Sequence, residues 1–232
     1  MLAVIQNTLN DLSHFLFPHI CLGCKTDQIA HSEVLCVACS SQLPKTGFIG
    51  IQHNATEQVF LPRIPIEAAG SLLYFNTKST TQELLHHLKY KQYKEVGNYL
   101  GNLMGMEIND SKRFNEVDAI VPIPIHPKKL YLRGYNQAEV IADGIAKFLQ
   151  LPTINNWLVK TVAIASQTKK NRVDRWQSVD QTYSLNADFQ QNFRHILLVD
   201  DVLTTGATLE TCARLFIEKG IKVSIATAAI TI

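Results

Sequence analysis

Two adjacent acids followed by a threonine-rich loop form the stretch of this chain that is best suited to chemistry. Asp200 and Asp201 end the apolar run HILLV, and a segment with helical periodicity follows the loop. Backbone N–H groups at the start of a helix have no intrahelical partner, and the helix dipole adds positive potential there. Glycine lets the main chain approach a ligand closely, and threonine hydroxyls add donors. We therefore predict a phosphate-binding loop made by Thr204, Thr205, Gly206, Ala207 and Thr208.

The two carboxylates need a different ligand from that loop. They cannot bind the same phosphate, because like charges repel. They suit hydroxyl groups, such as those of a ribose, or a Mg²⁺ ion with its waters. A phosphate-binding loop beside a pair of hydroxyl acceptors predicts a site for a ribose 5-phosphate. The alternative is a strand that ends in solvated acids before an ordinary helix cap.

Four cysteines near the N-terminus have the spacing of a metal site. Cys21 and Cys24 form one C-x-x-C pair, and Cys36 and Cys39 form a second after eleven residues. Four thiolates in two such pairs suit a structural zinc ion, which has no open position for catalysis. The alternatives are four unrelated thiols or a redox pair. Cys212 lies on an apolar helical stripe, and we expect a small buried side chain there.

Basic residues alternate with tyrosines in the segment LKYKQYKE, and more basic residues follow the apolar run VPIP. Lysines between aromatic rings suit a nucleic acid single strand, whose bases stack and whose phosphates pair with cations. The alternative is a solvated face with partly packed tyrosines. The residues that we predict for pyrophosphate or DNA binding are Lys89, Tyr90, Lys128, Arg133, Asn136 and Gln137.

The elements that must position these residues alternate between strand and helix. Apolar runs predict strands at 68–75, 118–125, 195–201 and 222–232. Helical patterns predict helices from Thr80, over 96–106, after Asn136 and over 207–219, with Thr80-x-x-Glu83 resembling a capping box. This order predicts an α/β domain with a mostly parallel sheet. Ligands of such sheets lie beyond the carboxyl ends of the strands, where the two aspartates are expected.

The chain divides into three predicted parts. Residues 1–44 are expected to form an N-terminal helix and the four-cysteine module, residues 45–65 a linker, and residues 66–232 the α/β domain. The first segment, MLAVIQNTLNDLSHFLF, has the pattern of an amphipathic helix rather than a signal peptide. Its apolar face suits packing on the protein, with a membrane surface as the alternative.

Composition excludes several classes of protein. The chain has 232 residues, 46% of them hydrophobic and 18% charged, which is enough apolar material for a core and excludes a disordered chain. A net charge of +2 argues neither for nor against nucleic acid. No apolar run approaches the roughly 18 residues of a membrane span, so we expect a cytoplasmic protein.

The run ILLVDDVLTTGAT resembles the phosphoribosyl pyrophosphate (PRPP) signature of type I phosphoribosyltransferases. The resemblance implies that fold, with helices on both faces of the sheet. It also implies that Asp200 and Asp201 contact the ribose hydroxyls and that residues 204–208 hold the 5-phosphate. Magnesium with PRPP would then be the ligand of an active enzyme.

Residues 121–146, VPIPIHPKKLYLRGYNQAEVIADGIA, are similar to the ComF family, as are CLGC…LCVACSSQLP and LKYKQYKE. That resemblance implies a competence protein for natural transformation that handles incoming single-stranded DNA, on the cytoplasmic side or at the inner face of the membrane. A DNA-uptake helicase or an inner-membrane channel would be its partner. The segment 166–179 departs from the family pattern, so its role in ligand binding is not carried over.

Three functions remain open at this point. The chain handles single-stranded DNA with a pocket for a 5-phosphorylated ribose, or it is an active Mg²⁺-dependent phosphoribosyltransferase with an unknown acceptor. The third possibility is a non-catalytic protein that docks on a partner through its cysteine module.

Overall fold

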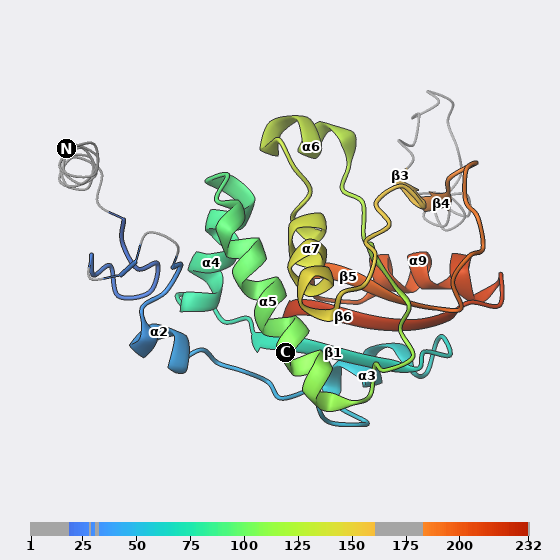
Figure 1. Ribbon diagram of the computed structural model, residues 1–232, viewed down its shortest axis with the longest axis horizontal. Helices are drawn as coiled ribbons and strands as arrows, with labels where there is room; N and C mark the ends of the chain where they lie inside the picture. Colours follow the sequence, from blue (N-terminus) through green and yellow to red (C-terminus); the bar gives the residue numbers. More distant parts are fainter. Residues whose placement is uncertain (1–18, 28, 31–32, 161–182, 232) are drawn as a thin grey trace, which may run out of the picture.

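A four-stranded parallel sheet forms the centre of the protein. The computed structural model describes residues 19–27, 29–30, 33–160 and 183–231. The strand order is β1 (Ala68–Tyr74), β6 (Lys222–Ile230), β5 (His195–Leu203) and β2 (Ala119–Pro122), and every neighbouring pair is parallel. Figure 1 shows this sheet with its helices around it. Strands that are buried on both faces are mostly apolar, and these four are, with the buried polar residues Ser71, Ser224 and Thr227 among the exceptions.

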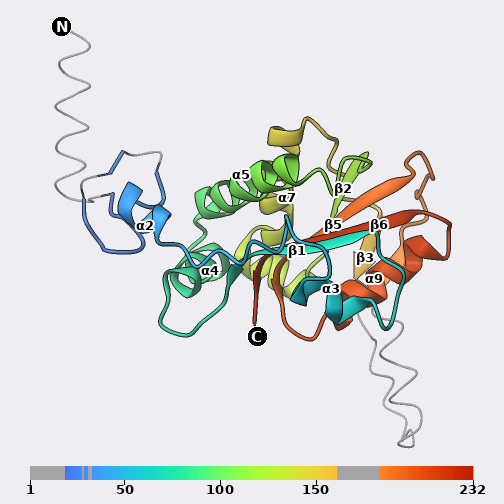
Figure 2. The same ribbon diagram turned by 90° about the horizontal axis from the view of Figure 1, so that it is seen from below.

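Helices cover both faces of the sheet (Figures 1 and 2). One face carries α4 (Thr80–Tyr90), α5 (Lys94–Ser111) and α7 (Gln137–Leu149), and the other carries α3 (Ala55–Phe60) and α9 (Ala207–Ile217). Successive side chains of a strand point to opposite faces, so one strand serves two cores. In β5, Leu197 and Val199 join the first core, and Ile196 and Leu198 join the second. The predicted α/β fold, a parallel sheet with helices on both faces, is confirmed.

Glycines bring α5 and α7 into close contact. A Cβ atom on Gly101 would lie 2.3 Å from the carbonyl oxygen of Ile141 and 2.9 Å from the Cα of Gly144. The two helix backbones therefore touch where neither residue has a side chain. This contact fixes the position of α7, whose first turn lies at the edge of the candidate site.

The helix boundaries differ in detail from the prediction. Ser79 rather than Thr80 caps α4, because its side chain accepts a hydrogen bond from the N–H of Gln82. A short helix, α6 (Pro127–Arg133), follows β2 and carries the basic residues that come after VPIP in the sequence. Asn136 caps α7 as predicted, through a bond from the N–H of Ala138.

The stretch 45–65, which was predicted as a linker, contains a helix and is packed against the sheet. It contains α3, whose cap Asn54 donates through its side-chain amide to the carbonyl oxygens of Phe48, Ile51 and Ala69. Phe60 is completely buried. Individual side chains and hydrogen bonds attach the segment to the sheet, so it needs no periodic apolar pattern. The domain boundaries at residues 44 and 65 stay a prediction.

A small antiparallel hairpin pairs β3 (Leu158–Lys160) with β4 (Tyr183–Leu185) outside the main sheet. The divergent segment 166–179 comes between these strands in the sequence and lies outside the described residues. The predicted N-terminal helix also lies outside the described residues. Another short helix, α2 (Val37–Ser41), follows the third cysteine. Within the described part of the chain, no helix is long and apolar enough to cross a membrane.

Candidate functional site

The two aspartates lie near the carboxyl end of β5, still within the strand. Asp200 pairs with Thr227 of β6, and the pairing continues to Leu203 and Ile230. Because the two acids are successive residues of a strand, their side chains leave opposite sides of it. Asp200 lines a small hollow of 50 Å³ with residues 202–209, whereas Asp201 is paired with Lys89 of α4 at 3.0 Å. The two predicted acids therefore have different neighbours, since Asp200 faces the hollow of the loop and Asp201 faces α4.

The predicted phosphate loop leads directly into α9. Gly206 has a φ of +76° and precedes the first helical residue. A Cβ atom at this position would lie 2.6 Å from Cγ1 of Val59 and 3.0 Å from the ring of Phe60, both in α3. Glycine is thus required for the backbone conformation and for the close approach of α3. The structure places all five loop residues, 204–208, along the same hollow.

Gly206→Ala is expected to lower the free energy of unfolding by about 2–5 kcal/mol, since positive φ costs about 1–2 kcal/mol and overpacking adds about 1–3 kcal/mol. Gly220 is the matched control, because its φ is +77° and a Cβ atom there would have no heavy atom within 4 Å. Gly220→Ala should cost only the conformational term. Urea denaturation measures both, and equal losses would contradict the packing argument.

An arginine from the packed 45–65 segment fixes the loop from outside. Arg63 donates to the carbonyl oxygen of Thr205 (3.3 Å) and to Glu210 of α9 (2.8 Å). Arg214 donates to the same carboxylate at 2.8 Å. The sequence analysis missed Arg63, because its partners lie more than 140 residues away along the chain.

The surroundings of Asp200 disfavour its ionised form. Burial and the neighbouring Asp201 charge raise the pKa of Asp200 to about 7, against lowering effects of the Asp201 N–H and of Lys89 and Lys160. The N–H of Asp201 donates to the Asp200 carboxylate at 2.8 Å. A cation or a hydroxyl donor placed beside Asp200 would relieve this strain.

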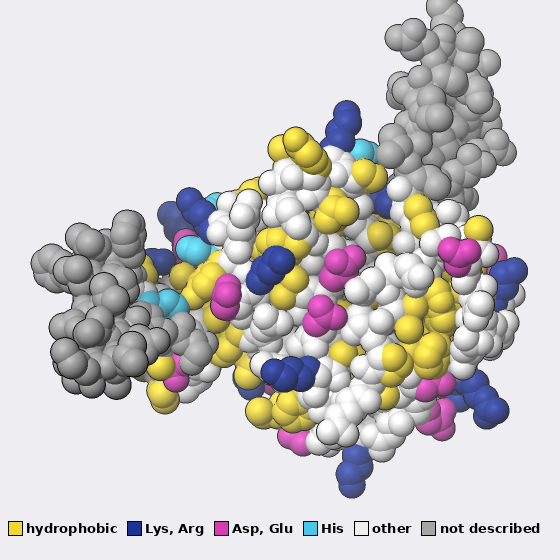
Figure 3. Space-filling model, turned by 45° about the horizontal axis from the view of Figure 1, so that its top comes forward, with side chains coloured by type: hydrophobic (Ala, Val, Ile, Leu, Met, Phe, Trp, Pro, Cys, Tyr) yellow, Lys and Arg dark blue, Asp and Glu magenta, His cyan; other side chains and the backbone are white. Residues whose placement is uncertain are grey.

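A cavity of 360 Å³ lies between the end of α4 and α6, and Lys89 and Tyr90 line it with Lys129 and Arg133. Tyr90 is 65% exposed, and the Arg133 guanidinium lies over its ring at 5.4 Å. Arg133 also donates to the side-chain oxygen of Gln137 at 2.6 Å. Figure 3 shows basic and hydrophobic side chains side by side at the top of the molecule, where α6 lies.

The other predicted contacts have different surroundings. Asn136 and Gln137 are almost fully buried, and the Asn136 amide donates to the carbonyl oxygen of Ile123 at 2.9 Å. These two side chains hold α7 and Arg133 in place. Lys128 is exposed at the start of α6, and Lys129 rather than Lys128 lines the cavity.

Two residues of the β3–β4 hairpin join the site without having been predicted. The Lys160 ammonium donates to the Tyr183 hydroxyl at 2.6 Å, and the buried Tyr183 belongs to the same core as Leu209 of α9. Burial is the main reason that the pKa of Tyr183 rises to about 12. The two residues are 23 positions apart and belong to three-residue strands, so local sequence gives little signal for their contact.

The four predicted cysteines come together in one cluster. Their sulfur atoms all lie within 4.8 Å of one another, and the N–H of Cys36 donates to the Cys21 sulfur at 3.3 Å. A Cβ atom on Gly23 would lie 2.7 Å from the Cys39 sulfur, so a larger residue would displace a thiol. The geometry fits a metal ion held by four thiolates.

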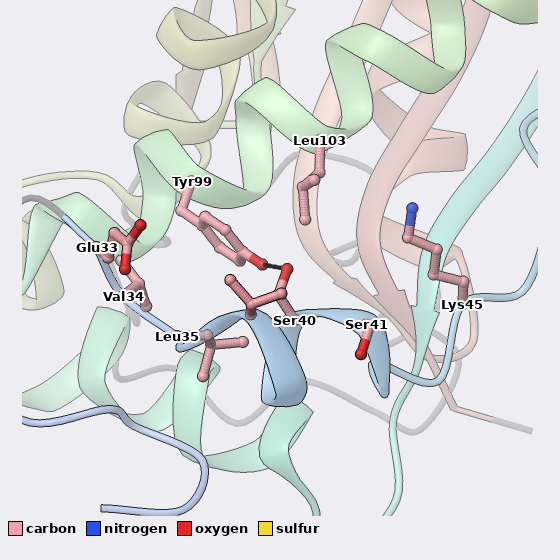
Figure 4. A pocket seen from close by; sticks show the side chains of 9 residues that line it. Glu33, Val34, Leu35, Ser40, Ser41, Lys45, Tyr99 and Leu103 are labelled. Atoms are coloured by element: carbon pink, nitrogen blue, oxygen red, sulfur yellow. Dashed lines mark hydrogen bonds between the residues drawn. The ribbon is translucent and has the colours of Figure 1, made fainter. Parts of the chain in front are cut away.

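A cavity of 620 Å³ lies between the cysteine module and α5 (Figure 4). The Ser40 and Tyr99 hydroxyls form a hydrogen bond of 2.7 Å at its wall. Val34, Leu35 and Leu103 make the lining largely apolar. An ion pair between Lys25 and Glu83 of α4, at 3.6 Å, adds a second contact between the module and the helices.

The sequence matches known families over its C-terminal part. The model of the phosphoribosyl transferase domain matches residues 136–231. Competence protein F of Haemophilus influenzae is 28% identical over 143 residues, which are 60% of this chain and 62% of that protein. DNA utilization protein YhgH of Escherichia coli K12 is 27% identical over 59% of this chain and 61% of its own length.

Two further similarities are more limited. Competence protein ComFC of Bacillus subtilis is 34% identical over 105 residues, or 44% of this chain and 39% of that protein. A glutamine PRPP amidotransferase from B. subtilis aligns with 61% of this chain and 30% of its own, with 18% identity and a TM-score of 0.43. Family membership follows from the sequence matches, together with the parallel sheet and the loop after β5. The chain is a ComF-type protein with a phosphoribosyltransferase-like domain.

Proposed function

We propose that this protein handles single-stranded DNA during DNA uptake and that its site accepts a 5-phosphorylated ribose of that strand. The names of its relatives, competence protein and DNA utilization protein, support the biological setting. The matched regions span less than two thirds of those relatives, so the function of the whole protein is inferred here from the site itself.

The main support for the proposal is the position of Lys89. Its ammonium pairs with Asp201 at 3.0 Å, and the same side chain lines the cavity of Tyr90 and Arg133. The Lys89–Asp201 pair thus places this cavity beside one of the two acids, and the proposal is that a bound strand extends from the phosphate loop to it. A ribose phosphate in the loop would have room for the next nucleotide beside Tyr90. A partly exposed tyrosine under a guanidinium offers stacking to a base and charge to a phosphate.

Two substitutions separate stacking from charge. We expect Tyr90→Ala to weaken binding of an oligothymidylate about tenfold, because stacking on an aromatic ring contributes about 1–3 kcal/mol per base. Arg133→Gln should reduce the dependence of log Kd on log salt by about 0.7, the effect of one neutralised phosphate. Lys219→Gln is the control, since Lys219 is exposed after the C-terminal end of α9, at the opposite end of the helix from the loop.

Fluorescence anisotropy across a salt series measures both effects. The expected result is salt-dependent affinity in the wild type, a loss of affinity in Tyr90→Ala and a reduced slope in Arg133→Gln. A wild-type protein that does not bind the oligonucleotide, or binds it with no salt dependence, would disprove the proposal.

A second candidate function is an active phosphoribosyltransferase that uses Mg²⁺ and PRPP with an unidentified acceptor. The raised pKa of Asp200 supports it, because a cation or ribose hydroxyls would stabilise that buried carboxylate. Oxygen ligands such as Asp200 and Asp201 fit a magnesium ion and its waters. The acids would hold the ribose, and the loop would hold its phosphate while the leaving pyrophosphate departs toward Lys89 and Arg133.

We also propose zinc as the ion of the cysteine module. A tetrahedral site with zinc–sulfur bonds of about 2.3 Å has sulfur–sulfur edges of about 3.8 Å. The sulfur atoms of Cys24 and Cys36 are 3.7 Å apart. The cytoplasmic location, attachment to the membrane surface, and a helicase or channel as partner stay predictions.

A further inference from the structure

We propose that Gln137 is a positioning residue, which holds the Arg133 guanidinium over the Tyr90 ring and leaves its charge free for a phosphate of the bound strand. The inference rests on the proposed function and adds to it the residue that fixes the geometry of the cation. The sequence predicted Gln137 as a ligand contact. Because only 1% of its surface is exposed, it acts through Arg133 and does not touch the strand.

Gln137 is attached to a closely packed part of the molecule. It is the first residue of α7, and the backbone of that helix touches α5, where a Cβ atom on Gly144 would lie 2.9 Å from the Cα of Gly101. Asn136, one residue earlier, caps the helix and donates to the carbonyl oxygen of Ile123 at 2.9 Å. The Gln137 side chain therefore starts from a backbone that is anchored on two sides.

Both ends of the Gln137 amide are hydrogen-bonded, and this determines which end faces the arginine. Its Nε2 donates to the carbonyl oxygen of Tyr135 at 3.3 Å, and its Oε1 accepts from Nη1 of Arg133 at 2.6 Å. A guanidinium has donors and no acceptor, so the amide oxygen must be the atom that faces it. Gly134, with a φ of +77°, makes the turn that brings both partners to one side chain.

The contact with Gln137 leaves the charge of Arg133 available to a ligand. Gln137 uses one N–H group of the guanidinium fork, and the guanidinium carbon lies 5.4 Å from the centre of the Tyr90 ring. The amide is neutral, so the arginine keeps its full charge, unlike Lys89, whose ammonium is paired with the Asp201 carboxylate at 3.0 Å. Since Arg133 lines the 360 Å³ cavity, its charge and its other donors would meet a phosphate there.

A purely structural role of Gln137 at the start of α7 is the competing explanation. It predicts that substitutions of similar size lower stability and change DNA affinity in the same way, whatever their charge. The positioning role predicts that the charge of the new side chain decides the effect on binding. A carboxylate at this position would pair with Arg133 and would be favoured by the start of the helix, so Gln137→Glu should fold and neutralise the cation.

The experiment is fluorescence anisotropy of the full chain with an oligothymidylate across a salt series. Gln137→Met has nearly the same shape but only a weak acceptor. We expect it to weaken binding about fivefold, the effect of one hydrogen bond, with the slope of log Kd against log salt unchanged. Gln137→Glu should instead reduce that slope by about 0.7, as Arg133→Gln does, although the arginine is still present.

Gln150→Glu is the matched control, because it is the same substitution at the exposed C-terminal cap of the same helix. It should leave affinity and slope unchanged. Arg133→Lys tests the geometry from the other partner and leaves the buried amide intact. Lysine keeps the charge but lacks the planar fork, so affinity should fall while the slope stays. Circular dichroism checks that each variant is folded.

The outcomes separate the positioning role from the proposed function. Full affinity in Gln137→Met or Arg133→Lys, or the wild-type slope in Gln137→Glu, would overturn the positioning role while DNA binding stands. Equal losses of affinity in Gln137→Met and Gln137→Glu with the same slope would favour the structural role and overturn it as well. If the wild type does not bind the oligonucleotide, the proposed function and the positioning role are both wrong.

Discussion

The double substitution Asp200→Asn and Asp201→Asn should reduce binding of PRPP with Mg²⁺ by about 100-fold or more. Each carboxylate would accept charge-assisted bonds from ribose hydroxyls or magnesium-bound waters, and such a bond contributes about 1.5–3 kcal/mol. Asparagine has nearly the same shape but no charge. Loss of two such interactions corresponds to a factor of at least 100.

The single variants should differ, because the two acids have different surroundings. Asp200 lines the phosphate hollow, so Asp200→Asn should account for most of the lost PRPP affinity. Asp201→Asn releases Lys89 from its 3.0 Å ion pair. The freed lysine would leave affinity for an oligonucleotide unchanged or higher, and the two ligands therefore distinguish the two acids.

Stability should change in the opposite direction from binding. The pKa of Asp200 is about 7 in the folded chain, above the ordinary 3.8 that it regains on unfolding. The folded state then binds more protons than the unfolded state between those values, so stability falls as pH rises from about 4 to 7. Asp200→Asn removes this titration. We expect its melting temperature to exceed that of the wild type at pH 8 and the pH dependence in this range to weaken.

Three measurements test the predictions for the Asp200 and Asp201 variants: calorimetry with PRPP and Mg²⁺, thermal melts from pH 4 to 8, and a transformation assay. Asp110→Asn on the exposed end of α5 is the control for the loss of one negative charge. Retained transformation with abolished PRPP binding would separate the pocket from DNA uptake. PRPP affinity that the double substitution leaves intact would contradict the assignment of the acids.

The second large expected effect is the unfolding of the cysteine module when its metal is lost. Chelation of the metal, or the substitution Cys36→Ser, should unfold residues 19–44, since four thiolates without a cation repel one another and structural zinc contributes about 10–16 kcal/mol in small domains. The Ser40–Tyr99 bond and the Lys25–Glu83 pair should be lost with it. The first core includes Cys21, Leu22, Val34 and Leu35 of the module, whereas the strands of the main sheet and the second core include none of its residues.

Metal analysis, limited proteolysis and circular dichroism measure this result. We expect one zinc ion per chain, early cleavage before residue 45 after chelation, and a largely preserved signal from the α/β domain. Cys212→Ala is the control, because Cys212 is buried in the core beside α9 and remote from the cluster. It should keep the zinc. A chain that contains no metal, or whose module resists cleavage after chelation, would disprove the zinc proposal.

Features that lie in one continuous stretch could be predicted from the sequence. The strand, the acids, the phosphate loop and α9 follow one another within residues 195–217, and their local pattern specifies their geometry. The four cysteines were predicted for the same reason. The α6 helix has local signals as well, since Pro127 stands at its first position and Gly134 at its end, although no helix was predicted there.

Features that depend on distant partners could not be predicted. The packing of residues 45–65 depends on hydrogen bonds such as that from Asn54 to Ala69, and on the buried ion pair between Glu57 and Arg113. The same holds for Lys160 and Tyr183, whose importance appears only when the hairpin lies against α9. Neither set leaves a periodic pattern in the sequence.

The placement of Asp200 and Asp201 on opposite sides of β5 has a consequence for how this site can diversify among relatives. Each acid has its own set of neighbours, so the partner of one can be exchanged while the other stays in its environment. A change in α4 would alter the surroundings of Asp201, and a change in the loop after β5 would alter those of Asp200. Insertion of a single residue before Asp200 would instead exchange the two environments. The spacing along β5 should therefore be less tolerant of change than the residues around it.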